Sequence, residues 1–136
     1  MKIPNKLPGL QLITALLAIY AAIWISLEGA LAQVLVMGVG VTVVAAGHLM
    51  QRYLGGRTVS VMVGVAVTAV LGLLTGIFSI GMTLIFMAIK TGLHAHGPEF
   101  TQAELTWVMQ QLPLWGIVGL LAGTAVGLLT AGFSNS

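Results

Sequence analysis

Three side chains in the short polar segment "HAHGPEF" are the clearest candidates for chemistry in this sequence. His94, His96 and Glu99 offer two imidazole nitrogens and a carboxylate, a ligand set that suits zinc. Residues two apart share a side only in an extended chain, and Gly97 and Pro98 permit that conformation. A metal site is therefore one hypothesis for this segment.

Two other interpretations of the segment remain open. The histidines titrate near neutral pH and could form a pH-sensitive feature, or they could be polar residues at the level of lipid headgroups. The chain contains neither a CxxC nor an HExxH pattern. This absence favours the headgroup interpretation, so we expect no metal and no cofactor.

Catalytic groups are scarce in the rest of the chain. There is no Asp and no Cys, and no serine has a histidine at a suggestive spacing. Ion-coupled transport usually places a carboxylate within a span, but Glu28 falls in a turn. His48 lies within an apolar stretch, where we expect a packing or interfacial role. The sequence therefore does not indicate an enzyme.

The composition places the elements around this segment in lipid. Of 136 residues, 58% are hydrophobic and only 6% are charged, with a mean hydropathy of +1.07, whereas a soluble domain carries about 25% charged residues. The net charge of +2 is spread thinly, which is not the clustered basic surface that nucleic acids require. We expect the lipid bilayer, and no nucleic acid, as a partner.

Four apolar segments are long enough to be membrane spans of roughly 20 residues. The third would be about 46 Å long as one helix, so it must tilt, bend or project beyond the bilayer. The predicted fold is one all-α domain over residues 1–136, an integral membrane bundle of four transmembrane helices. The predicted spans cover residues 10–27, 31–50, 59–89 and 113–133.

A short amphipathic helix is predicted before the fourth span, over residues 102–112. "TQAE" has the form of a capping box, with Thr101 as N-cap and Glu104 three residues later. An apolar face follows at i, i+3, i+4 and i+7, and we expect this helix to lie in the membrane interface. The residues of that face are Leu105, Val108, Met109 and Leu112.

The charges predict the orientation. Lys2, Lys6, Arg52 and Arg57 fall on one side and only Lys90 on the other, as the positive-inside rule expects. We therefore expect a multi-pass protein of the plasma (inner) membrane, with both termini cytoplasmic and the loop 90–112 outside. The acids and tryptophans also fall outside, near the level of an aromatic belt. They are Glu28, Glu99, Glu104, Trp24, Trp107 and Trp115.

One alternative concerns the first span. "ALAQ" at Ala30–Gln33 has the A-x-A form of a signal-peptidase site. The preceding apolar stretch is long for a signal peptide and lacks a helix-breaking proline, which favours a retained span.

Small residues recur every four positions in the two last spans, which keeps them on one helix face. Such faces let helix backbones approach closely in lipid, where no hydrophobic drive brings helices together. The spacing does not say whether they pack within one chain or between chains. The predicted packing residues are Gly64, Thr68, Gly72 and Gly76, then Gly119, Gly123, Gly127 and Ala131; weaker stripes are Ala18, Ala22 and Ser26, and Gly38, Thr42 and Ala46.

The segment "MAIKTGLHAHGPEFTQAELTWVMQQLPLWGIVGLLAG" resembles a stretch of small bacterial multi-pass membrane proteins of unassigned function. The resemblance covers about the last third of the chain and implies a bacterial membrane.

These patterns predict a non-enzymatic membrane protein that acts by helix association, as an accessory, assembly or scaffolding subunit. Its partners would be other membrane protein subunits or further copies of itself. The alternative is a small oligomeric channel or transporter with an outer vestibule formed by His94, His96 and Glu99.

Overall fold

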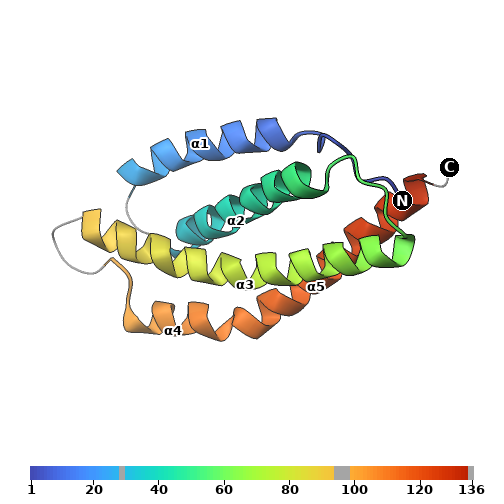
Figure 1. Ribbon diagram of the computed structural model, residues 1–136. Helices are drawn as coiled ribbons and strands as arrows, with labels where there is room; N and C mark the ends of the chain where they lie inside the picture. The colour runs from blue at the N-terminus through green and yellow to red at the C-terminus, as the bar shows by residue number, and fades with distance from the viewer. Residues whose placement is uncertain (28–29, 94–98, 135–136) are drawn as a thin grey trace.

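The computed structural model describes residues 1–27, 30–93 and 99–134, and the regular elements in this part of the chain are all α-helices. The all-helical class predicted from the sequence is therefore confirmed. In chain order the helices are α1 (Leu10–Ser26), α2 (Leu31–Leu54), α3 (Val61–Leu93), α4 (Gln102–Gln110) and α5 (Leu112–Ser134) (Figure 1).

Three of the helices, α2, α3 and α5, are long and apolar enough to cross a membrane, which indicates a membrane protein. Helix α1 is also apolar but has only 17 residues. At 1.5 Å per residue it is about 25 Å long, slightly less than the roughly 30 Å of a hydrocarbon core.

Two helices run further than their apolar segments. Helix α2 continues to Leu54 and α3 to Leu93, beyond the predicted ends at 50 and 89. Hydropathy locates the last apolar side chain of a span. The helix itself ends at the last residue whose backbone makes helical hydrogen bonds, which can lie further along the chain. In α2 this point is the Gly55–Gly56 pair, where Gly56 has a φ of 77°, a conformation that glycine adopts without steric cost.

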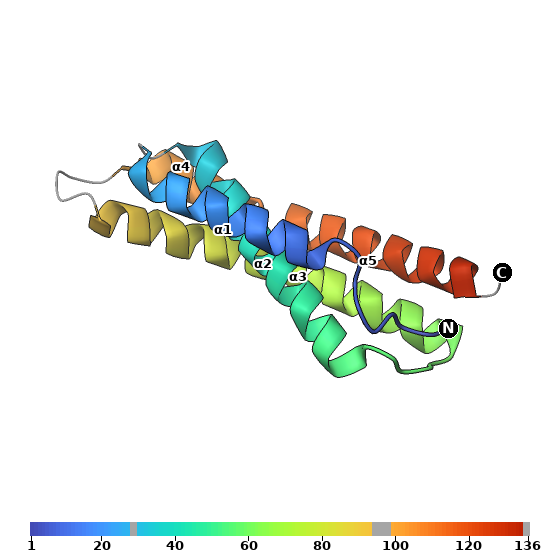
Figure 2. The ribbon, with the colours of Figure 1, turned by 90° about the horizontal axis from the view of Figure 1, so that it is seen from above.

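Helix α3 is the centre of the arrangement (Figures 1 and 2). Helix α5 makes the most extensive contact with it and α2 the next, while α1 packs on α2. The apolar core lies towards the end where α1 finishes and α2 begins. Its buried members are Trp24, Val34, Met37, Ile80, Met87, Phe100 and Val108.

At the opposite end, residues 1–3 form an N-terminal strap along the α2–α3 connection. The strap is held by backbone hydrogen bonds: the Ile3 N–H donates to the Arg57 carbonyl (3.0 Å) and the Val59 N–H to the Met1 carbonyl (3.0 Å). The Met1 ammonium donates to the Val59 carbonyl at 2.7 Å. The chain therefore starts at the same end as the α2–α3 connection, and helix α5 finishes at this end too (Figure 1).

Candidate functional site

Helices α3 and α5 meet along their glycine faces, which we call the glycine seam (Gly72 and Gly76 with Gly119 and Gly123). A Cβ at Gly72 would collide with the Gly119 carbonyl oxygen and lie 2.8 Å from the Gly123 Cα. A Cβ at Gly76 would collide with the Trp115 carbonyl oxygen. Only glycine permits backbones to approach this closely.

The pairing along the seam is antiparallel. Residue numbers rise on one helix as they fall on the other: Gly127 lies against Thr68, and Gly119 against Gly72. Ala131 is buried, whereas Gly64 meets the side chain of Met1 from the strap. The small-residue faces of α3 and α5 are thus occupied within one chain.

Glycines also mark the other helix crossings. A Cβ at Gly38 of α2 would collide with the Thr83 hydroxyl of α3. Gly40 and Gly47, on another side of α2, lie against Leu17 and Leu10 of α1. Helix α2 therefore approaches both neighbours through positions that lack a side chain.

Helices α2 and α5 flank α3 and leave an apolar groove of about 360 Å³ between them. Helices α2 and α5 diverge in the half of the molecule away from the core (Figure 2). The walls of the groove are Val39, Val43, Ala46, Gly47 and Met50 of α2 and Trp115, Val118, Gly119, Ala122, Gly123 and Val126 of α5, and its floor is α3 from Thr68 to Ser79.

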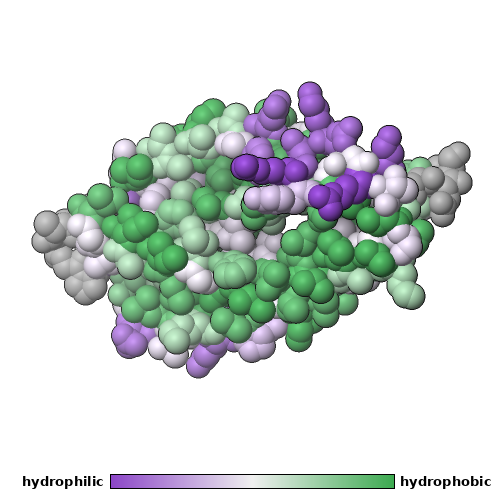
Figure 3. All heavy atoms as spheres, viewed as in Figure 1, coloured by the Kyte–Doolittle hydropathy of each residue, from purple (hydrophilic) through white to green (hydrophobic). Residues whose placement is uncertain are grey.

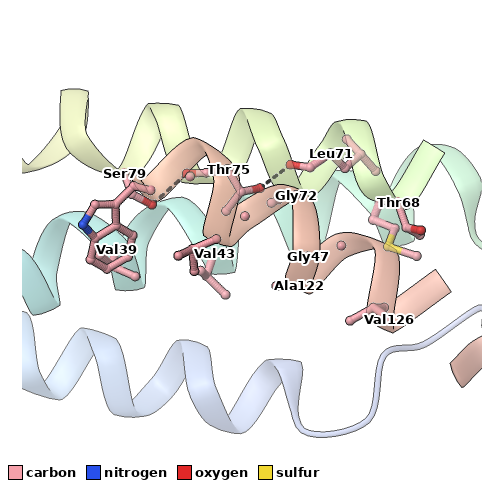
Figure 4. Close-up of a pocket in the computed structure, with 17 residues that line it drawn as sticks. Val39, Val43, Gly47, Thr68, Leu71, Gly72, Thr75, Ser79, Ala122 and Val126 are labelled. Carbon is pink, nitrogen blue, oxygen red and sulfur yellow. Dashed lines mark hydrogen bonds between the residues drawn. The ribbon is translucent and has the colours of Figure 1, made fainter. Parts of the chain in front are cut away.

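The hydroxyls on the floor of the groove are satisfied by their own helix. Thr75 donates to the Leu71 carbonyl and Ser79 to the Thr75 carbonyl, each at 2.7 Å (Figure 4). Thr68 donates to the Val65 carbonyl at 3.0 Å. Because these donors are already used, the groove presents an almost wholly apolar surface.

Lys90 is the second unusual feature, since its side chain is fully buried. Its ammonium donates to the carbonyls of Trp24 (2.8 Å) and Ile25 (3.1 Å), in the last turn of α1. It also lies 4.9 Å from the centre of the Trp24 ring, within range of a cation–π contact. The last carbonyls of a helix lack partners and carry partial negative charge, so a cation is stabilising there.

The sequence analysis placed Lys90 in a loop, whereas it lies within the last turn of α3 and is buried. Trp24, expected near the level of an aromatic belt, is buried in the core as well. Trp24 is only 3% exposed, with Phe86 packed edge-on against it at 5.6 Å. One signal was available in the sequence: Lys90 continues the helical spacing of Ile80, Thr83 and Met87, the buried face of α3.

Only part of the polar segment "HAHGPEF" belongs to the described structure. His94 and His96 lie outside the described residues, while Glu99 is within them. In the described ranges, no three His, Cys, Asp or Glu side chains are grouped as a metal site would require. The structure therefore brings no ligand set together, and the metal hypothesis remains untested.

His48 of α2 contacts α1 through a side-chain hydrogen bond. Its Nε2 lies 3.0 Å from the Thr14 hydroxyl, which donates its proton to the Leu10 carbonyl. The hydroxyl therefore accepts from His48 Nε2–H. This contact fits the packing role expected from the sequence.

Helix α4 begins with the predicted capping box. The Thr101 N–H donates to the Glu104 carboxylate (2.8 Å), and the Glu104 N–H donates to the Thr101 hydroxyl (3.2 Å). Of the predicted apolar face, Leu105 and Val108 pack inward, whereas Met109 and Leu112 are exposed. The face of α4 that packs on the protein is thus narrower than predicted.

The capping box predicts a pH dependence of α4. The Thr101 backbone and hydroxyl donors hold the pKa of Glu104 below its ordinary value. The ionised carboxylate therefore stabilises α4 above the ordinary glutamate pKa, and this contribution is lost as the pH falls through the lowered pKa. We expect amide protection across residues 102–110, corrected for intrinsic exchange, to fall on acidification. In Glu104→Gln this acid-dependent step should vanish; an unchanged step would contradict the assignment.

Basic side chains gather at the end that carries the strap. Lys2, Lys6, Arg52 and Arg57 are all exposed there, and hydrophilic residues concentrate over this end of the molecule (Figure 3). Two of the three acids, Glu99 and Glu104, lie next to or in α4 at the other end, and the third, Glu28, lies outside the described residues. The molecule is therefore polarised along its length.

Comparisons with known proteins add no assignment: no protein-family model, no curated protein and no solved structure matches this chain.

Proposed function

We propose that the chain crosses the plasma (inner) membrane four times, with both termini in the cytoplasm and the α3–α4 connection and α4 outside. The strap supports this topology because it ties the start of the chain to residues 57–59, at the far end of α2 from the α1–α2 connection. Helix α1 therefore runs antiparallel to α2. Lys2, Lys6, Arg52 and Arg57 would all be cytoplasmic, as the positive-inside rule requires.

The function that this geometry supports best is association within the bilayer, as a non-enzymatic accessory, assembly or scaffolding subunit. One observation carries it: in the most apolar stretches of α2, α3 and α5, only 17% to 22% of residues are buried inside the chain. Most of the apolar surface of these helices is therefore available to lipid or to other membrane proteins.

The small-residue face of α1 is the surface we assign to a partner helix. The glycine faces of α3 and α5 are used within the chain, whereas Ala18, Ala22 and Ser26 of α1 are exposed. A partner backbone could approach α1 along these positions as closely as the helices of this chain approach one another.

The test is purification of the tagged full chain in a mild detergent, followed by native mass measurement. We expect a second membrane protein in fixed ratio, and a loss of about tenfold or more in its recovery from the double variant Ala18→Leu, Ala22→Leu. The matched control is Ala66→Leu, the same enlargement at an exposed alanine of α3.

Two results would contradict association through α1. The first is equal recovery of the partner by the double variant and the control. The second is a homogeneous homo-oligomer without any partner. This result would favour the alternative function, a small channel or transporter. That alternative depends on His94 and His96, outside the described residues, and remains a prediction.

A further inference from the structure

The apolar groove opens in the half of the molecule that carries the basic residues. Along α2 its wall runs from Val39 to Met50, about one turn before the end of this helix at Leu54. Along the other helices it runs from Trp115 and Ser79 to Val126 and Thr68. The groove is thus elongated along α3 from Ser79 to Thr68 (Figure 4), the direction that leads back towards the start of α3 and the charged end.

The chemistry of the groove selects a hydrocarbon chain. Its walls are valine, alanine, glycine, methionine and Trp115, and the hydroxyls of Thr75 and Ser79 are bonded to their own helix. A polar ligand would lose most of its hydrogen bonds to water there. A hydrocarbon chain has no such hydrogen bonds to lose.

The charges at the end of the groove select the headgroup. Arg52 is exposed in the last turn of α2, and Arg57 is exposed in the connection to α3. Lys2 pairs with Thr58 through the strap, so the backbone of a third cationic residue is fixed at this end of the molecule. The sequence from Met1 to Leu27 and from Gly29 to Pro98 contains no acid to neutralise them, so this end is complementary to an anionic headgroup.

We propose that the groove binds one acyl chain of an anionic phospholipid, whose headgroup is attracted by the exposed cations of this end, Arg52, Arg57, Lys2 and Lys6. The lipid would fill the hollow half of the bundle, where α2 and α5 diverge, as the core fills the other half. This inference goes beyond the proposed function: it requires that α2, α3 and α5 lie in the bilayer but needs no protein partner.

The groove is tested by filling it. The full chain is reconstituted in vesicles of equal parts phosphatidylcholine and phosphatidylglycerol, extracted in a mild detergent, and analysed by native mass spectrometry for bound lipid. We expect Ala122→Leu, in the wall of the groove, to lower bound phosphatidylglycerol about tenfold. Its control is Ala125→Leu, an exposed position of α5 outside the groove, which should bind as the unaltered chain does.

A second variant keeps this test decisive. If Ala122→Leu fails to fold, Ala46→Leu fills the same groove from the α2 wall and should give the same loss. Equal lipid binding by the filled variants and by Ala125→Leu would overturn the proposal. So would a lipid-free dimer, because the groove would then be covered by a second copy.

The headgroup is tested with the double variant Arg52→Gln, Arg57→Gln. The unaltered chain should bind more phosphatidylglycerol than phosphatidylcholine. In the variant the ratio of bound phosphatidylglycerol to bound phosphatidylcholine should be roughly tenfold lower, although a lipid is still bound. An unaltered chain that retains both lipids equally, or a variant with undiminished preference, would overturn the assignment. Neither outcome depends on whether a protein partner is found.

Discussion

Replacing Gly72 with alanine should lower the free energy of unfolding by about 3 kcal/mol. The new Cβ would collide with the Gly119 carbonyl oxygen and lie 2.8 Å from the Gly123 Cα. Both obstacles are backbone atoms, so no side chain can rotate away and the two helices must separate. The measurement is reversible unfolding in mixed micelles, followed by tryptophan fluorescence.

Gly81→Ala is the matched control for this effect. Gly81 lies in the same helix, and a Cβ there would meet no atom within 4 Å. Alanine is the better helix former by about 1 kcal/mol, so this variant should be neutral or slightly more stable. If the two variants lost the same stability, the glycine seam would not be what holds α5 on α3.

Replacing Lys90 with methionine should cost roughly 3 kcal/mol, the second largest effect we expect. Methionine has a similar length but cannot donate to the carbonyls of Trp24 and Ile25, which then lose a charged partner at the end of α1. The last turn of α1 should loosen before the rest of the molecule. Hydrogen exchange of the α1 amides, compared with those of α3, measures this local loss.

The control for the lysine is Lys6→Met, an exposed cation at the opposite end of the molecule. It should leave both the unfolding free energy and the exchange of α1 nearly unchanged, because exposed cations contribute little to stability. Equal effects of the two substitutions would show that the Lys90 contacts do not hold α1 in place.

The elements of this fold could be predicted from the sequence because they follow from local chemistry. Apolar runs of sufficient length predict helices in lipid, and the Thr101–Glu104 capping box marks the start of α4 within one residue. The C-terminal ends of α2 and α3 could not be predicted as well, because each helix continues past the end of its apolar run, through Gln51 in α2 and Lys90 in α3.

The contacts between elements could not be predicted in the same way. A four-residue spacing shows that Gly119, Gly123 and Gly127 share a face, but it contains no information about which helix covers that face. The burial of Lys90 likewise depends on where α1 ends in space, since its partners lie 65 and 66 residues earlier in the chain. The groove is a consequence of how α2 and α5 diverge, which no local pattern encodes.

The topology on which the whole account depends can be measured directly. The chain has no cysteine, so single cysteines at the exposed positions Lys6, Thr58 and Gln102 can be labelled without background, with a maleimide that does not cross membranes. In intact cells, four crossings predict that only Gln102→Cys reacts, and that the other two react after the membrane is opened. Labelling of Lys6→Cys in intact cells while Thr58→Cys stays protected would contradict the account, because α1 would then not cross the membrane.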